Sequence, residues 1–193
     1  MQRGRIIVLN GVSSAGKTTL ARVLQARMPQ QYLYLPIDLL NDISPPKDSP
    51  SYPERFTADP MPIVTGFFGC IKSFADYGIN IIADLVLAQR SLGYFLSVFP
   101  DGDYPVMMVH VTCPLDELRR REKARGDRKI GHGESQLAAL MPREGYDLVV
   151  DTHAETNEVN ADRIIDLSRD FSEFKLFQGL WMGERKYDDI YKR

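Results

Sequence analysis

The chain has 193 residues, of which 44% are hydrophobic and 26% are charged, and its formal net charge is −2. This length fits one compact α/β domain with a core of its own. The near-neutral charge gives no electrostatic basis for binding nucleic acid, and no apolar run approaches the roughly 20 residues of a membrane span. We therefore expect a single soluble domain with neither a nucleic-acid nor a membrane partner.

The N-terminus and the cysteines favour a cytoplasmic location. The first ten residues hold a short apolar run that leads straight into a glycine loop, and no small-residue cleavage site follows it. Two cysteines, Cys70 and Cys113, are too few for a disulfide framework. We expect both thiols to lie in the core.

Five β-rich apolar runs alternate with stretches of helical length, which is typical of a parallel sheet covered by helices on both faces. The expected strands are Arg5–Asn10, Tyr32–Ile37, Ile79–Asp84, Val106–Thr112 and Asp147–Asp151. The expected helices include Lys17–Met28, Pro62–Tyr77 and Leu115–Lys123. The sequence therefore predicts an α/β fold with three layers.

Two segments fall outside this pattern. We expect a substrate-side loop over about residues 39–62, because residues 44–62 are rich in proline, aspartate and serine. Loops of this length within a domain are often functional, although a plain surface loop remains an alternative. The C-terminal extension, about residues 171–193, mixes aromatic and charged residues without a clear period.

The strongest motif is a phosphate-binding loop. Residues 11–18 read GVSSAGKT and match GxxxxGK[ST], directly after a strand and before a helix. The glycines allow a tight turn whose backbone N–H groups point at phosphate oxygens, next to the positive end of the helix. We expect Lys17 to reach the β- and γ-phosphates, and the Thr18 hydroxyl to bind Mg²⁺. The predicted nucleotide-binding residues are Gly11, Ser13, Ser14, Ala15, Gly16, Lys17, Thr18, Thr19 and Arg121.

Two aspartates follow predicted strands and should project at the carboxyl edge of the sheet, where ligands of open α/β sheets bind. Asp38 is the candidate base, which would accept the proton of an attacking hydroxyl. Asp84 closes an apolar strand in the manner of an aspartate that holds magnesium. The alternative for either residue is a helix N-cap or a turn.

Residues 119–128 read RRREKARGDR, which places six basic side chains within ten residues. Arg121, Arg125 and Arg128 would share one face of a helix, which Gly126 is expected to interrupt. We expect Arg125 and Arg128 to close over the transferring phosphate and to stabilise the charge of the transition state.

The alternative for this segment is a solvated helix face, on which Glu117 and Glu122 pair with neighbouring arginines. Residues 129–135, KIGHGES, contain two glycines and suit a mobile lid that excludes water. The whole lid is expected over about residues 119–135.

These pieces together resemble the chloramphenicol phosphotransferase family of P-loop kinases. The matching segments are residues 8–11 with 13–17, 38–40, 81–84, 124–128 and 144–153, within about Ile6–Ile165. The resemblance implies a fold like that of nucleoside monophosphate kinases and shikimate kinase, with a short lid. It also implies ATP as donor, a primary hydroxyl of an antibiotic as acceptor, Asp38 as base, and Arg125 and Arg128 as lid residues. Here a single Asp84 stands where the family has an aspartate pair.

The sequence therefore predicts an ATP-dependent kinase that moves the γ-phosphoryl group to a hydroxyl of a small molecule. The expected cofactors are ATP and Mg²⁺. The predicted catalytic residues are Asp38, Lys17, Arg125 and Arg128, and the predicted metal ligands are Thr18 and Asp84. Two alternatives stay open: a nucleoside, nucleotide or nucleotide-sugar kinase, including a toxin-type enzyme, and a regulator that binds ATP without transferring phosphate.

Overall fold

The fold is a five-stranded, fully parallel β-sheet with helices on both faces. It is described by a computed structural model that covers residues 2–46, 49–50, 59–126, 130–140 and 145–191. The strands are β1 (Ile6–Asn10), β2 (Tyr32–Pro36), β3 (Asn80–Leu85), β4 (Val106–Thr112) and β5 (Leu148–Asp151). They lie in the order β2-β3-β1-β4-β5. The predicted strands are confirmed, because each observed end lies within one residue of its expected position.

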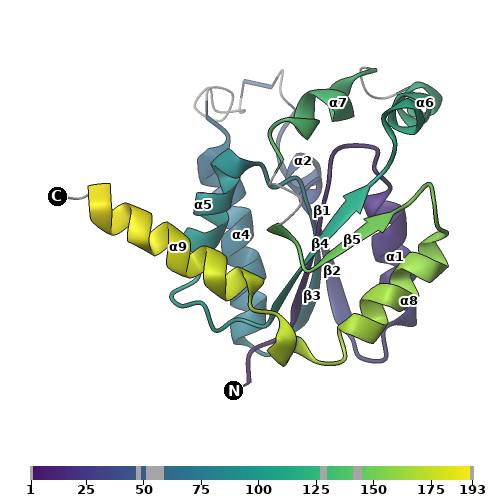
Figure 1. The fold of residues 1–193 in the computed structure, drawn as a ribbon. Helices are drawn as coiled ribbons and strands as arrows, with labels where there is room; N and C mark the ends of the chain where they lie inside the picture. Colours follow the sequence, from purple (N-terminus) through teal and green to yellow (C-terminus); the bar gives the residue numbers. More distant parts are fainter. Residues whose placement is uncertain (1, 47–48, 51–58, 127–129, 141–144, 192–193) are drawn as a thin grey trace.

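The helices form the two outer layers and a cap over one edge. They are α1 (Lys17–Arg27), α2 (Leu39–Ile43), α4 (Met61–Asp76), α5 (Gln89–Ser97), α6 (Leu115–Arg125), α7 (His132–Leu137), α8 (Asn157–Leu167) and α9 (Leu176–Tyr191), with a 3-10 turn at Phe171–Glu173. Helices α1 and α8 cover one face of the sheet, and α4, α5 and α9 cover the other (Figure 1). Helices α2, α6 and α7 lie beyond the carboxyl ends of the strands (Figure 1).

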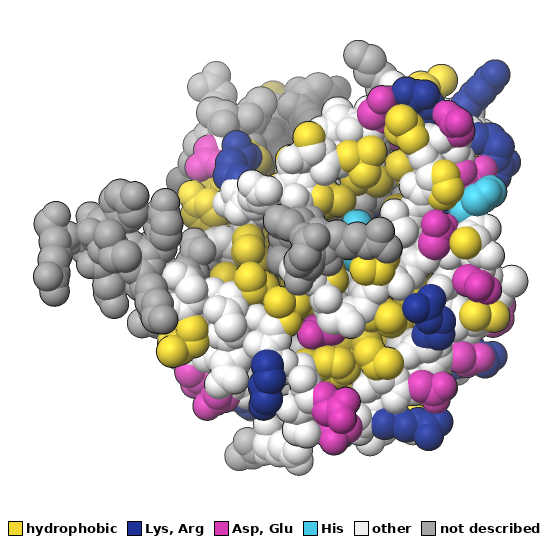
Figure 2. Space-filling model, viewed as in Figure 1, with side chains coloured by type: hydrophobic (Ala, Val, Ile, Leu, Met, Phe, Trp, Pro, Cys, Tyr) yellow, Lys and Arg dark blue, Asp and Glu magenta, His cyan; other side chains and the backbone are white. Residues whose placement is uncertain are grey.

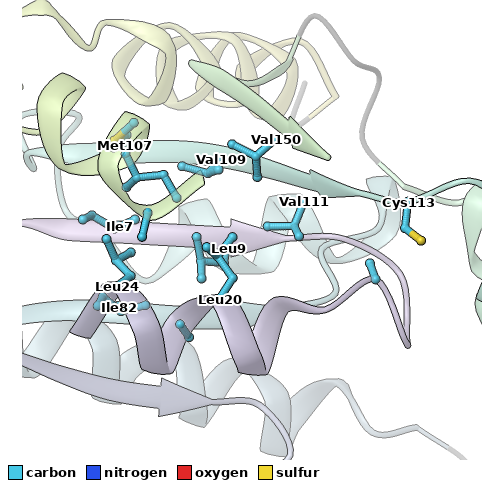
Figure 3. Packing of buried hydrophobic residues seen from close by; sticks show 14 of the residues in the cluster. Ile7, Leu9, Leu20, Leu24, Ile82, Met107, Val109, Val111, Cys113 and Val150 are labelled. Carbon is cyan, nitrogen blue, oxygen red and sulfur yellow. The ribbon is translucent and has the colours of Figure 1, made fainter. Parts of the chain in front are cut away.

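The central strand β1 is buried on both faces, as expected for a strand in the middle of a parallel sheet. On one face, Ile7 and Leu9 pack with Leu20 and Leu24 of α1 (Figure 3). On the other face, Ile6 and Val8 pack among the aromatic side chains of α4 and α5. Burying an aliphatic side chain of this size contributes about 1.5–3 kcal/mol. The core therefore fixes the strand from which the phosphate loop departs.

The C-terminal segment differs from the sequence expectation, because most of it is helical. Phe177 of α9 is only 1% exposed, and its ring packs edge-on against Phe99 at 5.0 Å. Trp181 donates an indole N–H to the Phe99 carbonyl at 3.1 Å. The start of α9 is thus part of the apolar core, and the helix then runs away from the sheet (Figure 1).

The two cysteines differ in their exposure to solvent. Cys113 is buried, but Cys70 is exposed, so the expectation of two core thiols was wrong for Cys70. Figure 2 shows acidic and basic side chains interspersed over the visible face, in line with the small net charge. In the part of the chain that the structure describes, no helix is both long and apolar enough to cross a membrane.

Candidate active site

The phosphate loop is shaped by its glycines. A Cβ atom at Gly11 would lie 2.2 Å from the Val111 carbonyl oxygen, so only glycine lets the loop pass β4 this closely. Gly16 has φ of 92° and Ser14 has φ of 65°, both in the left-handed region. This backbone turns successive N–H groups toward one side, which is the geometry that binds anions.

Lys17 begins α1 and faces the interior of the loop. Its side chain is 8% exposed, and its ammonium donates to the Val12 carbonyl at 3.0 Å. The Asp84 Oδ1 atom lies 3.7 Å from the same ammonium. Lys17 is the only charged side chain in residues 11–18, and these contacts orient its ammonium group.

Asp84 accepts hydrogen bonds from two hydroxyl groups at the carboxyl edge of the sheet. The Thr18 and Tyr34 hydroxyls each donate to its Oδ2 atom at 3.0 Å. Burial, followed by the neighbouring Asp84 charge, raises the pKa of Tyr34, so its hydroxyl stays protonated and remains a donor. Because Asp84 is 5% exposed, these bonds stabilise an otherwise poorly solvated carboxylate.

The oxygens of Thr18 and Asp84 fit a magnesium ion. Mg²⁺ at phosphate sites takes one or two protein oxygens and completes its shell with phosphate oxygens and water. Among the described residues, no group of three or more histidine, cysteine, aspartate or glutamate side chains is arranged to hold a metal by itself. A metal bound here would therefore depend on a phosphate ligand as well as on the protein.

A cleft of about 1110 Å³ runs along the phosphate loop at the carboxyl edge of the sheet. Most of the predicted site residues line it: Ser13, Ser14, Gly16, Lys17, Thr18, Thr19, Asp38, Asp84, Arg121 and Arg125. Two do not, because Gly11 lies against β4 and Ala15 is fully buried behind the loop. Arg128 lies outside the described residues.

Asp38 lines the same cleft as the phosphate loop and is the residue before α2. It occupies the N-cap position, yet its side chain makes no capping hydrogen bond. The alternative role as a helix cap is therefore not what the side chain does here. Asp38 and Lys17 therefore line the same cleft.

Arg121 links α6 to the phosphate loop and to Thr152, the residue after β5. Its guanidinium donates to the Thr152 hydroxyl at 2.9 Å, the Thr152 carbonyl at 3.0 Å and the Ser14 carbonyl at 3.4 Å. Glu117 accepts a fourth bond from Arg121, at 2.8 Å. Hydrogen bonds from Arg120 and then Arg121 lower the pKa of Glu117 to about 2.

The segment predicted as a lid contains the end of helix α6 and most of helix α7. Helix α6 runs to Arg125 and ends at Gly126, which has φ of 69° as the end of a helix requires. The second part of the segment expected as a lid contains another helix, α7, at His132–Leu137. That helix packs directly on the phosphate loop, where a Cβ atom at Gly133 would lie 2.7 Å from the Ser13 carbonyl oxygen.

Glu122 also differs from its expected role as a partner of surface arginines. It is 1% exposed and accepts 2.7 Å hydrogen bonds from the backbone N–H groups of Gly131 and Gly133. The carboxylate therefore anchors the first turn of α7 to α6. Glu117, by contrast, does pair with neighbouring arginines, as expected.

Sequence analysis missed four side chains that shape the site: Tyr34, Glu122, Gln136 and Thr152. The contacts of Tyr34, Gln136 and Thr152 join residues far apart in the chain, with 123 positions between Gln136 and Ser13. Glu122 instead binds residues 9 and 11 positions away. Thr152 was within reach of sequence reasoning, because it lies in the segment 144–153 that carries the family resemblance. No local pattern marks the other three.

A smaller pocket of about 220 Å³ lies next to the cleft and shares Ile37 and Val86 with it. Its walls are mostly apolar, and Arg90 and Ser91 add polar atoms at the start of α5. The lining residues are Ile37, Met61, Val64, Phe68, Leu85, Val86, Ala88, Arg90 and Ser91.

Comparison with known proteins identifies the family of this chain. A family model described as "Chloramphenicol phosphotransferase-like protein" matches residues 4–169. A relative from Mycobacterium tuberculosis strain H37Rv, named "Putative O-phosphotransferase Rv2636", is 34% identical over 176 aligned residues, which cover 80% of this chain and 77% of the relative.

Solved structures give the same fold. The APS kinase CysC of M. tuberculosis, in complex with AMPPNP and APS, superposes with a TM-score of 0.66 at 18% identity, covering 88% of this chain and all of its own. The shikimate kinase of Acinetobacter baumannii, in complex with shikimate, superposes with a TM-score of 0.53 at 18% identity, covering 86% of this chain and 93% of its own. The chain therefore belongs to the chloramphenicol phosphotransferase-like family, and it is a phosphotransferase with the fold of P-loop kinases.

Proposed function

We propose that this enzyme transfers the γ-phosphoryl group of ATP to a hydroxyl of a small molecule. The observation that carries the proposal is that Asp38 lines the same cleft as Lys17 and the phosphate loop. A carboxylate in that position can orient an alcohol toward the γ-phosphorus and accept its proton. A protein that only binds ATP has no need of such a group, which argues against the regulator.

Each wall of the cleft has a role in this proposal. The N–H groups of the loop and Lys17 hold the β- and γ-phosphates, with Arg121 keeping the loop in shape. Thr18 and Asp84 hold Mg²⁺, which neutralises phosphate charge when it is bound. Arg125, at the end of α6, stabilises the charge that develops on the transferring group, together with Arg128. Most of the rate enhancement then comes from positioning and electrostatics.

The smaller pocket is the proposed place of the acceptor. It borders the cleft at Ile37, the neighbour of Asp38, and has apolar walls that suit a ring or an alkyl group. Arg90 would meet a polar or anionic substituent of the acceptor, which keeps a nucleotide or an acidic metabolite among the candidates beside chloramphenicol. In this arrangement the segment 39–62 forms the substrate side of a single domain, and residues 119–135 form its lid.

A radiochemical screen tests the proposal. Purified protein, Mg²⁺ and ATP labelled at the γ-phosphate are incubated with hydroxylated antibiotics, nucleosides, sugars and hydroxy acids, with chloramphenicol as the first compound. The expected result is label transferred to at least one small molecule, and its loss in Asp38→Asn. Release of label only as inorganic phosphate, at a rate that no compound changes, would contradict a phosphotransfer function.

A further inference from the structure

Helix α7 contacts the phosphate loop through one carboxamide. The Oε1 atom of Gln136 accepts a 2.7 Å hydrogen bond from the backbone N–H of Ser13. The carbonyl of the same peptide unit, that of Val12, accepts the 3.0 Å hydrogen bond from Lys17. Because the N–H and C=O of a trans peptide point in opposite directions, this peptide is held between Gln136 on one side and the Lys17 ammonium on the other.

Gln136 is itself held in place from both ends of α7. At the start of the helix, the buried Glu122 carboxylate binds two backbone N–H groups, and Gly133 lies against the Ser13 carbonyl. After the end of the helix, the Ala139 carbonyl accepts a 2.8 Å hydrogen bond from Gln89 of α5. The Nε2 atom of Gln136 lies 3.3 Å from His132 Nε2, which leaves Oε1 directed at the loop.

We propose that Gln136 is a positioning residue for phosphoryl transfer, because it fixes the Val12–Ser13 peptide with its carbonyl toward Lys17. The Ser13 residue is 3% exposed, so loss of the carboxamide would deprive a buried N–H of a short, strong acceptor. Rotation of the peptide toward another acceptor would turn the Val12 carbonyl away from Lys17. The ammonium would then lose the contact that directs it into the cleft.

The proposal rests on the proposed function only for the role of Lys17 in binding phosphate. The orientation of the peptide is a property of the protein alone, so it can be measured without substrate. Gln136→Met keeps the length of the side chain but removes the acceptor, whereas Gln136→Glu keeps an acceptor oxygen. Leu137→Ala changes an exposed residue of the same helix and serves as the control.

The test uses the whole chain and two readouts. Nuclear magnetic resonance of the nucleotide-free protein follows hydrogen exchange at the Ser13 amide and the resonance of the Lys17 ammonium. In Gln136→Met, we expect Ser13 exchange to rise about tenfold, as for the loss of one hydrogen bond, and the Lys17 signal to shift. Gln136→Glu should restore the protection of Ser13, and Leu137→Ala should change neither signal.

Turnover is the second readout. In Gln136→Met, we expect ATP turnover to fall about tenfold while the melting temperature stays close to that of the wild type. Unchanged Ser13 exchange and Lys17 resonance in this variant, or equal changes in Leu137→Ala, would overturn the proposal. A failure of the proposed function is distinguishable, since wild-type protein would then transfer phosphate to no acceptor, whatever the two signals show.

Discussion

The hydroxyl of Tyr34 donates a 3.0 Å hydrogen bond to Asp84 Oδ2, the same oxygen that accepts the Thr18 hydroxyl. One strand thus orients the carboxylate that another strand supplies, because β2 and β3 are parallel neighbours. The guanidinium of Arg22 lies over the Tyr34 ring at 4.4 Å and limits its movement. The proposed metal ligand is therefore held by a residue that need not touch the metal.

Tyr34→Phe removes this hydrogen bond but keeps the ring. We expect the Mg²⁺ concentration for half-maximal turnover to rise about tenfold, as for other residues that orient metal ligands. A magnesium titration of ATP turnover measures the effect, with Tyr94→Phe on the exposed face of α5 as the control. An unchanged magnesium requirement would show that Tyr34 has no part in metal binding.

Asp38→Asn keeps the size of the side chain but removes its ability to accept a proton. We expect turnover to fall about 10²- to 10⁴-fold, the usual contribution of a general base. ATP affinity should stay close to that of the wild type, because the proposed partner of Asp38 is the acceptor hydroxyl and not the triphosphate. Steady-state kinetics with calorimetry separate the two quantities, and full turnover in the variant would remove Asp38 as the base.

Arg125→Ala removes a guanidinium from the end of α6. If Arg125 acts on the transition state, turnover should fall by up to about 10³-fold while ATP affinity changes little. Lys123→Ala is a matched control, since Lys123 is an exposed cation on the same helix. Equal losses of rate and ATP affinity would instead assign Arg125 to binding of the ground state.

An ionic cluster at the amino edge of the sheet should make stability depend on pH. A hydrogen bond from Lys72, and then one from Tyr104, lower the pKa of Asp76. The bidentate contact of Arg3 lowers the pKa of Asp101. Both carboxyls titrate at lower pH in the folded protein than in the unfolded chain. Their stabilisation is therefore complete above the unfolded pKa of about 3.9 and is lost as the pH falls through the folded pKa.

Asp101→Asn should remove part of this dependence. We expect the free energy of unfolding at neutral pH to fall by about 0.5–1 kcal/mol, a surface-pair magnitude, because Asp101 is 41% exposed. The difference between the variant and the wild type should narrow as the pH falls from about 5 to 3. Urea titrations across that range measure it, with Glu155→Gln, at an exposed side chain, as the control. A difference that stays constant with pH would rule out an ionic origin.

The sequence was sufficient to predict the strands of the sheet and the position of the phosphate loop. Continuous apolar runs define the five strands, and the spacing of glycines with Lys17 defines the loop, because both signals are local. The helix α9 was missed although Phe177 and Trp181 stand four residues apart, since the charges that follow obscure the period. The role of Gln136 could not be predicted, because it depends on a contact with a residue 123 positions away. The role of Glu122 was missed because the arginines around it indicate surface ion pairs, whereas its partners are the backbone N–H groups of Gly131 and Gly133.

The most direct test of the central claim is calorimetric titration of the purified protein with ATP and Mg²⁺. Wild-type protein should bind one ATP per chain, and Lys17→Ala should bind it about tenfold to a hundredfold more weakly, the effect of losing hydrogen bonds from a charged group. A wild-type protein without measurable affinity for any purine triphosphate would contradict the account.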